Sequence, residues 1–63
     1  MGPIPSAETQ EEIDRHEAEG FERYGRASGP MGVKLHFLMH NDGRKVIIVE
    51  DKDWDFPEVY ALQ

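Results

Sequence analysis

The chain has 63 residues, contains no cysteine and carries a net charge of −6 at pH 7. A chain of this length forms at most one domain and buries only about 60% of its unfolded surface, so we expect marginal stability or association with another molecule. The composition excludes disulfides and thiolate zinc sites. No apolar run approaches the roughly 20 residues that cross a bilayer.

The charge falls into three blocks of alternating sign. Residues 8–19 carry a net charge of −5, residues 20–49 carry +3 and residues 50–58 carry −4. Direct nucleic-acid binding needs a basic footprint that this balance does not provide. A basic surface on a larger protein is the better match for two acidic blocks. Because the chain lacks cysteine and begins without a secretory signal, we expect a cytoplasmic protein with no membrane partner.

A flexible lead-in at residues 1–6 is predicted to precede a single domain at residues 7–63. Residues 9–12 have the spacing of a capping box, and Ser6 is an alternative N-cap one turn earlier. Three Glu-to-Arg pairs spaced i,i+4 continue the helical pattern to a stop at Gly25. Gly20 costs about 1 kcal/mol inside a helix, so the alternative is a helix that ends near Glu19.

The hydrophobic period changes to two at Val33, which predicts a β-hairpin over residues 33–51 with its turn at Asn41-Asp42-Gly43. A two-residue turn would place Leu35 opposite Glu50 on an apolar face. We prefer a three-residue loop with Gly43 in the left-handed conformation, because it gives Glu50 a lysine as its cross-strand neighbour. The pairs predicted for this register are Lys34–Glu50, Leu35–Val49 and Phe37–Ile47.

The preferred register divides the hairpin into two faces. The face predicted to hold the helix carries Val33, Leu35, Phe37, Met39, Ile47 and Val49. The opposite face is also too apolar for full exposure to water, so we expect the C-terminal segment, a second copy or a partner to cover it. The residues predicted for this oligomer face are His36, Leu38, His40, Val46 and Ile48.

The C-terminal segment combines aromatic and acidic side chains. Residues 58–62 can form a third, edge strand, although Pro57 can also open a short helical turn. Trp54 and Phe56 either close the core, with the neighbouring acids in water, or serve as hot spots for a basic partner. The predicted partner-binding residues are Glu50, Asp51, Asp53, Trp54, Asp55, Phe56 and Glu58.

No motif for catalysis or metal binding is complete. An acidic 1-3-5 spacing begins at Asp51 as in an EF-hand, but Phe56 occupies the position that requires glycine. His36 and His40 lie about 13 Å apart on one strand, too far to share an ion. No nucleophile, base and orienting group occur together. We therefore expect no enzymatic activity, no cofactor and no metal.

These observations predict an α+β fold, with one N-terminal helix packed on a small antiparallel sheet. The predicted function is that of a small acidic, non-catalytic protein-binding module. In its most concrete form it is an inhibitor or decoy that mimics nucleic acid at a basic site of a larger protein. The alternative is a homodimeric or accessory structural subunit that assembles through the sheet.

Overall fold

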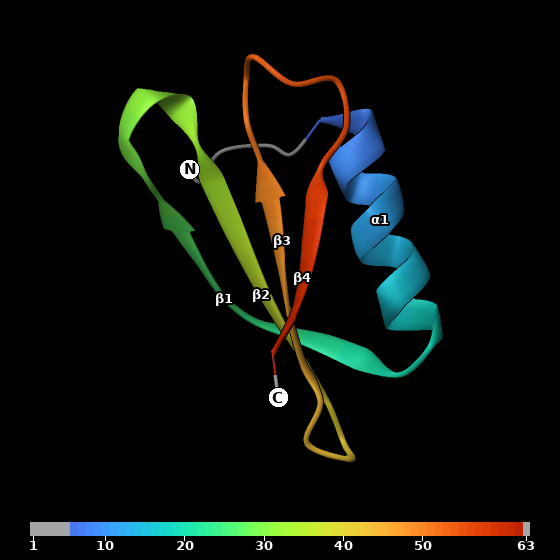
Figure 1. Cartoon of the computed structure of the whole chain (residues 1–63). Coiled ribbons are helices and arrows are strands. Elements are labelled where there is room, and N and C mark those ends of the chain that lie inside the picture. Colours follow the sequence, from blue (N-terminus) through green and yellow to red (C-terminus); the bar gives the residue numbers. More distant parts are fainter. Residues whose placement is uncertain (1–5, 63) are drawn as a thin grey trace.

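One helix and four antiparallel strands make up residues 6–62, the part of the chain described by this computed structural model (Figure 1). The elements are α1 (Ala7–Ala18), β1 (Phe21–Ser28), the 3₁₀ turn η1 (Pro30–Gly32), β2 (Lys34–His40), β3 (Lys45–Glu50) and β4 (Glu58–Leu62). The strands form one sheet in the order β1-β2-β3-β4. The predicted α+β fold is confirmed, and β4 is the edge strand expected at 58–62. Apart from Ser6, the predicted lead-in lies outside the described residues.

Helix α1 begins at one of the two predicted caps and ends earlier than the preferred prediction. The side chain of Ser6 accepts a hydrogen bond from the backbone N–H of Thr9 at 3.3 Å. The helix ends at Ala18, so the predicted continuation to Gly25 is wrong and the alternative end near Glu19 is confirmed. Within residues 6–62, no helix has both the length and the apolar character needed to cross a membrane.

The residues expected at the end of the helix form strand β1 instead. Gly20 adopts φ +104°, a conformation that side-chain-bearing residues rarely adopt, and the chain reverses there. The His40 ring packs against Gly20, and its Nε2 donates to the Glu19 carbonyl at 3.0 Å. The Glu-to-Arg pairs are worth only about 0.2–0.5 kcal/mol each. Pairing of β1 with β2, which is interrupted at Tyr24, outweighs them.

The predicted register of the hairpin is confirmed. Gly43 has φ +96° in the loop between β2 and β3. Lys34 lies opposite Glu50, with its Nζ 3.5 Å from Glu50 Oε2. The other two predicted pairs also form, Leu35 with Val49 and Phe37 with Ile47.

The helix covers the face of the sheet opposite to the predicted one. The core between α1 and the sheet consists of Ile13 from the helix and Phe21, Leu38, Val46 and Ile48 from the strands. Leu38 and Ile48 are fully buried, His36 is 1% exposed and His40 is half-buried. The residues predicted as an oligomer face (His36, Leu38, His40, Val46 and Ile48) therefore lie on the helix side and largely inside the core. The prediction that the Val33 face holds the helix is wrong.

A polar contact explains why the helix chooses this face. Glu50 shares a face with Leu38 and Ile48, and its Oε1 accepts from the backbone N–H of Ser6 at 2.9 Å. The first N–H groups of a helix lack intrahelical partners, so a carboxylate there is favourable. The helix side contributes a single large buried apolar chain, Ile13, and the branched side chains of β2 and β3 fill the remaining space.

The core encloses an unpartnered histidine. Within the described residues, neither ring nitrogen of His36 has a hydrogen-bond partner. Burial lowers the pKa of His36 from its ordinary value of 6.5, and the positive charges of Arg23, Lys34 and Arg26 add to this, while Glu50 opposes it. The folded protein therefore holds His36 in its neutral form at neutral pH.

Two glycine substitutions separate backbone strain from a steric clash. A Cβ at Gly20 would lie 2.8 Å from His40 Nε2, whereas a Cβ at Gly43 would have no heavy atom within 4 Å. Both positions have positive φ. We expect Gly43→Ala to lower the free energy of unfolding by about 1 kcal/mol and Gly20→Ala by about 2–3 kcal/mol, measured by urea unfolding. Equal effects would contradict the close approach of His40 to Gly20.

The buried His36 predicts a loss of stability in mild acid. Its pKa is lower in the folded than in the unfolded chain, so its contribution is intact above pH 6.5 and is lost as the pH falls below that value. We expect the free energy of unfolding, followed by circular dichroism, to decrease between pH 7 and pH 5. His36→Leu should reduce this decrease and stabilise the chain at pH 5. An unchanged pH profile in this variant would contradict the assignment to His36.

Candidate functional site

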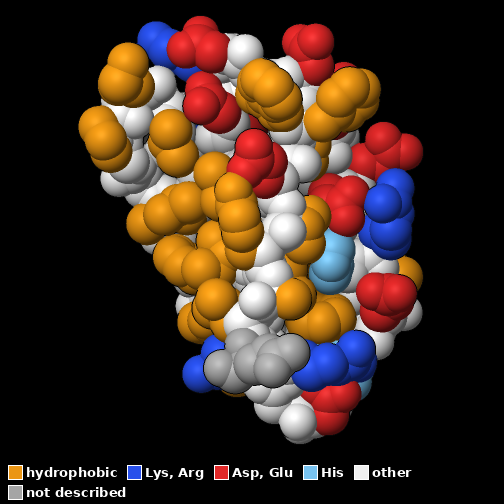
Figure 2. Space-filling model, viewed as in Figure 1, with side chains coloured by type: hydrophobic (Ala, Val, Ile, Leu, Met, Phe, Trp, Pro, Cys, Tyr) orange, Lys and Arg blue, Asp and Glu red, His pale blue; other side chains and the backbone are white. Residues whose placement is uncertain are grey.

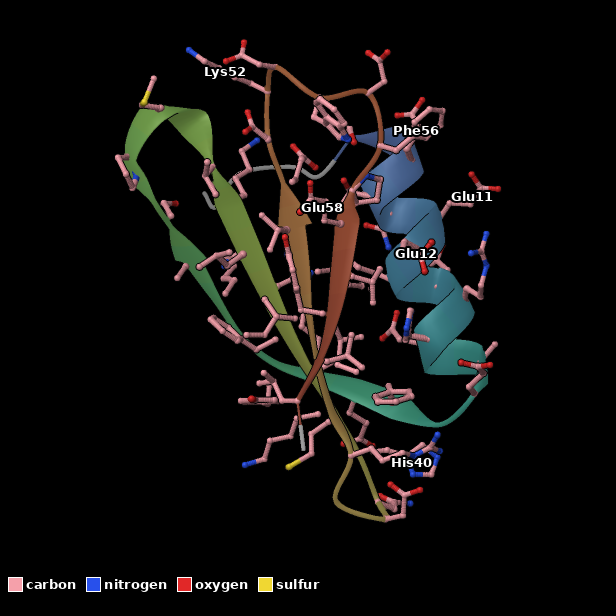
Figure 3. The ribbon with its side chains drawn as sticks, viewed as in Figure 1. Glu11, Glu12, His40, Lys52, Phe56 and Glu58 are labelled. Carbon is pink, nitrogen blue, oxygen red and sulfur yellow. The ribbon has the colours of Figure 1, made fainter. Side chains whose placement is uncertain are left out.

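The loop between β3 and β4, residues 51–57, bends over the start of α1 (Figure 3). Asp51 organises its first turn: Oδ1 accepts from the backbone N–H of Asp53 at 3.0 Å and the carbonyl accepts from the N–H of Trp54 at 3.0 Å. This is the local turn that aspartate favours. The stem of Lys52 packs against Gly32 of η1, which turns this cation toward the connection between β1 and β2.

A cavity of about 430 Å³ lies between this loop and the helix start. Its lining consists of four acidic residues, two aromatic residues, one lysine and one serine. They are Ser6, Glu8, Glu50, Asp51, Lys52, Trp54, Asp55 and Phe56. Figure 2 shows acidic side chains gathered at this end of the molecule with hydrophobic side chains between them. We call these lining residues the acidic-aromatic site.

Trp54 and Phe56 do not close the core. They are 64% and 67% exposed, among the most exposed large hydrophobic side chains of residues 6–62. Phe56 extends outward beside the start of α1 (Figure 3). Of the two interpretations of these aromatic residues, the one that leaves them at the surface matches the structure. Large exposed aromatic groups in a concave surface are typical of binding hot spots.

Glu50 keeps its negative charge at the base of the site. Partial burial alone would raise its pKa. Hydrogen bonds from the Ser6 backbone and the Thr9 side chain, together with the Lys34 charge, outweigh burial and leave the pKa below its ordinary value. An ionised carboxylate in a partly desolvated hollow attracts a cation more strongly than one in open water.

The structure brings most of the predicted partner-binding residues together. Glu50, Asp51, Trp54, Asp55 and Phe56 all line the cavity, whereas Asp53 and Glu58 do not. Glu58 lies on β4, where its Oε2 accepts a hydrogen bond from the hydroxyl of Tyr60; this bond raises the pKa of that phenol.

The sequence prediction missed Glu8 and Ser6 as parts of the site. Ser6 was visible only as a candidate helix cap, and Glu8 only as one of many acids in the first turn. Their place beside the loop depends on α1 packing against the end of β3. No local pattern reveals that contact.

The histidines serve structural contacts. His16 Nδ1 donates to the Glu12 carbonyl at 2.9 Å, and His40 accepts from the Asp42 N–H at 3.1 Å through Nδ1. Over residues 6–62, no three histidine, aspartate or glutamate side chains come together as metal ligands. The carboxylates and exposed rings of the acidic-aromatic site offer contacts to positive charge and to planar or apolar groups.

The chain matches no protein-family model, no curated protein and no solved structure in the three comparisons made with known proteins.

Trp54 is the sole tryptophan, so its fluorescence reports directly on the acidic-aromatic site. We expect acrylamide to quench the folded chain within about twofold of the unfolded chain, because Trp54 is exposed. At low salt, caesium should quench more strongly than iodide because carboxylates surround the ring, and about 0.5 M salt should remove most of this difference. A protected, blue-shifted emission would contradict the exposed position.

Proposed function

We propose that this protein is a small, non-catalytic protein-binding module whose acidic-aromatic site docks on a basic surface of a larger protein. The observation that carries the proposal is the exposure of Trp54 and Phe56 within a hollow lined by four carboxylates. Exposing two large rings to water is unfavourable in a monomer of this size, and a binding surface accounts for it.

The chemistry of the site favours arginine and lysine side chains as ligands. Guanidinium groups stack on aromatic faces and form bidentate bonds with carboxylates. Glu8 and Asp55 are exposed, whereas Glu50 and Asp51 are partly buried. A basic side chain that enters between the rings would therefore meet negative charge at both the rim and the base.

Surfaces rich in arginine and lysine occur where proteins bind nucleic acid, because these side chains hold the phosphates. A protein with a net charge of −6 and a concentrated acidic end can compete for them. We therefore propose an inhibitor or decoy that occupies a nucleic-acid-binding type of site. For a chain without cysteine, we propose a cytoplasmic location.

Titration with a hexa-arginine peptide tests this function, with Trp54 fluorescence as the readout. We expect saturable binding that weakens by about tenfold or more between low salt and 0.5 M salt. The triple variant Asp51→Asn, Asp53→Asn, Asp55→Asn keeps side chains that accept hydrogen bonds but removes three charges, and it should weaken binding by about tenfold. Trp54→Phe, followed by calorimetry, should weaken it less than Trp54→Ala.

The matched control removes the same number of charges from the exposed surface of α1: Glu11→Gln, Asp14→Asn and Glu17→Gln. It should weaken binding by less than about threefold, because these charges lie outside the site. If the two triple variants lose affinity equally, binding follows net charge alone and the site assignment is wrong. Affinity capture with mass spectrometry, compared between wild type and the loop variant, then identifies the partner.

A further inference from the structure

The face of the sheet turned away from α1 is apolar and uncovered within the described part of the chain. Its side chains come from all four strands, and Figure 2 shows hydrophobic side chains following the sheet. We call it the open face; its residues are Tyr24, Leu35, Phe37, Met39, Ile47, Val49, Tyr60 and Leu62. Tyr24 and Tyr60 are about half exposed. The Tyr24 and Phe37 rings already contact, with centroids 6.1 Å apart.

The charged side chains of the open face lie at its ends, Glu58 at one end and Lys45 with Glu22 of β1 at the other. Its middle row is uncharged, with Phe37, Ile47 and Tyr60 side by side on β2, β3 and β4. At the end next to the β3–β4 loop, Glu58 pairs with Val49; at the opposite end, Lys45 pairs with Leu62. Along β3 and β4, the face therefore runs from negative through apolar to positive.

We propose that the open face packs against the open face of a second copy, with the two-fold axis lying across the strands at the middle row. This symmetry sets each strand on the same strand of the other copy with its two ends exchanged. Lys45 then lies over Val49 of the second copy, beside Glu58 on the neighbouring strand, so a Lys45–Glu58 ion pair forms twice. The middle rows meet each other and bury Phe37, Ile47 and Tyr60. The same patch serves both copies, as an isologous dimer requires.

The alternative two-fold axis, parallel to the strands, is unfavourable because it leaves Glu58 unpaired and brings the acidic loops together. It would set Lys45 against Met39 and Glu58 against Ala27 of the other copy, since β3 would face β2 and β4 would face β1. Lys45 would lie beside Glu22, the neighbour of Met39, whereas Glu58 would lose water without gaining a cation. It would also place the two acidic β3–β4 loops side by side. The transverse axis places them at opposite ends.

The area is sufficient for a modest dimer. Four strands about 4.8 Å apart, each rising about 3.3 Å per residue, give a face on the order of 400 Å². Side chains project from this face and add to its area. Face-to-face packing of two copies therefore buries on the order of 1,000 Å² in total, the lower bound for a specific interface. Interfaces at the small end of this range are typical of weak association, so we expect a dissociation constant in the micromolar rather than the nanomolar range.

Zero-length carbodiimide coupling of the full chain tests the predicted contact directly. Lys45 pairs with Leu62, four residues along β4 from Glu58, so the two groups lie about 13 Å apart within one copy and cannot couple there. We expect a Lys45–Glu58 cross-link in the dimer band, identified by mass spectrometry. Lys45→Arg keeps the charge but removes the reactive amine, so it should lose the cross-link and retain the dimer.

Sedimentation between about 1 µM and 1 mM measures the association itself. Lys45→Glu and Glu58→Lys should each weaken the dimer about tenfold, and the double exchange should restore it to within about threefold of wild type. Glu11→Lys on the outer surface of α1 is the control and should leave the dimer intact. Circular dichroism verifies that each variant is folded.

Three outcomes would overturn the proposal. They are a monomer over the whole concentration range, single variants that dimerise as wild type does, and a double exchange that fails to restore association. The proposal is independent of the acidic-aromatic site, because the open face contains neither Trp54 nor Phe56. Binding of hexa-arginine by a monomeric variant would separate the two surfaces.

Discussion

The arrangement of helix and sheet depends on the carboxylate of Glu50. One of its oxygens accepts from the backbone N–H of Ser6, and the other lies 3.5 Å from Lys34 Nζ. Ser6 is the N-cap of α1, so the carboxylate stands at the positive end of the helix dipole. Glu50 is the last residue of β3, and the hairpin register determines on which face of the sheet its side chain lies. The contact with Ser6 therefore determines which face α1 covers. It also keeps one negative charge at the base of the acidic-aromatic site.

The choice of face has consequences for both surfaces of the molecule. A helix of 12 residues with Ile13 as its one large buried apolar side chain covers only a small core. The other apolar face, which carries Phe37 and Ile47, is left without a cover among residues 6–62. In a larger domain, a second helix would fill this position. A small chain gains the missing burial most directly from another molecule.

Sequence reasoning succeeded where the decisive interactions were local. The turn at Gly43 and the Lys34–Glu50 pair determine the hairpin register, and both belong to adjacent strands. It failed for β1, which was predicted as helix. The Glu-to-Arg pairs that favour a helix can be read from the sequence, whereas the packing of Gly20 against His40 joins residues far apart in the chain. It failed for the sheet faces because both are similarly apolar, so the periodicity could not show which one the helix covers. The acidic loop was predicted as a binding segment from its composition, but the helix residues beside it depend on tertiary packing.

Both proposed surfaces fit on one molecule because they face different directions. Figure 1 shows the β3–β4 loop at one end of the sheet and the β2–β3 turn at the other. A two-fold axis across the strands therefore sends the two acidic ends of a dimer away from each other. The longest dimension of one copy is 33 Å, several times the screening length of about 8 Å at physiological salt, so the two acidic ends repel each other weakly. Such a dimer would present two sites facing opposite ways. It would bridge two basic surfaces instead of binding one surface twice, and avidity would arise only on targets that are themselves repeated or dimeric.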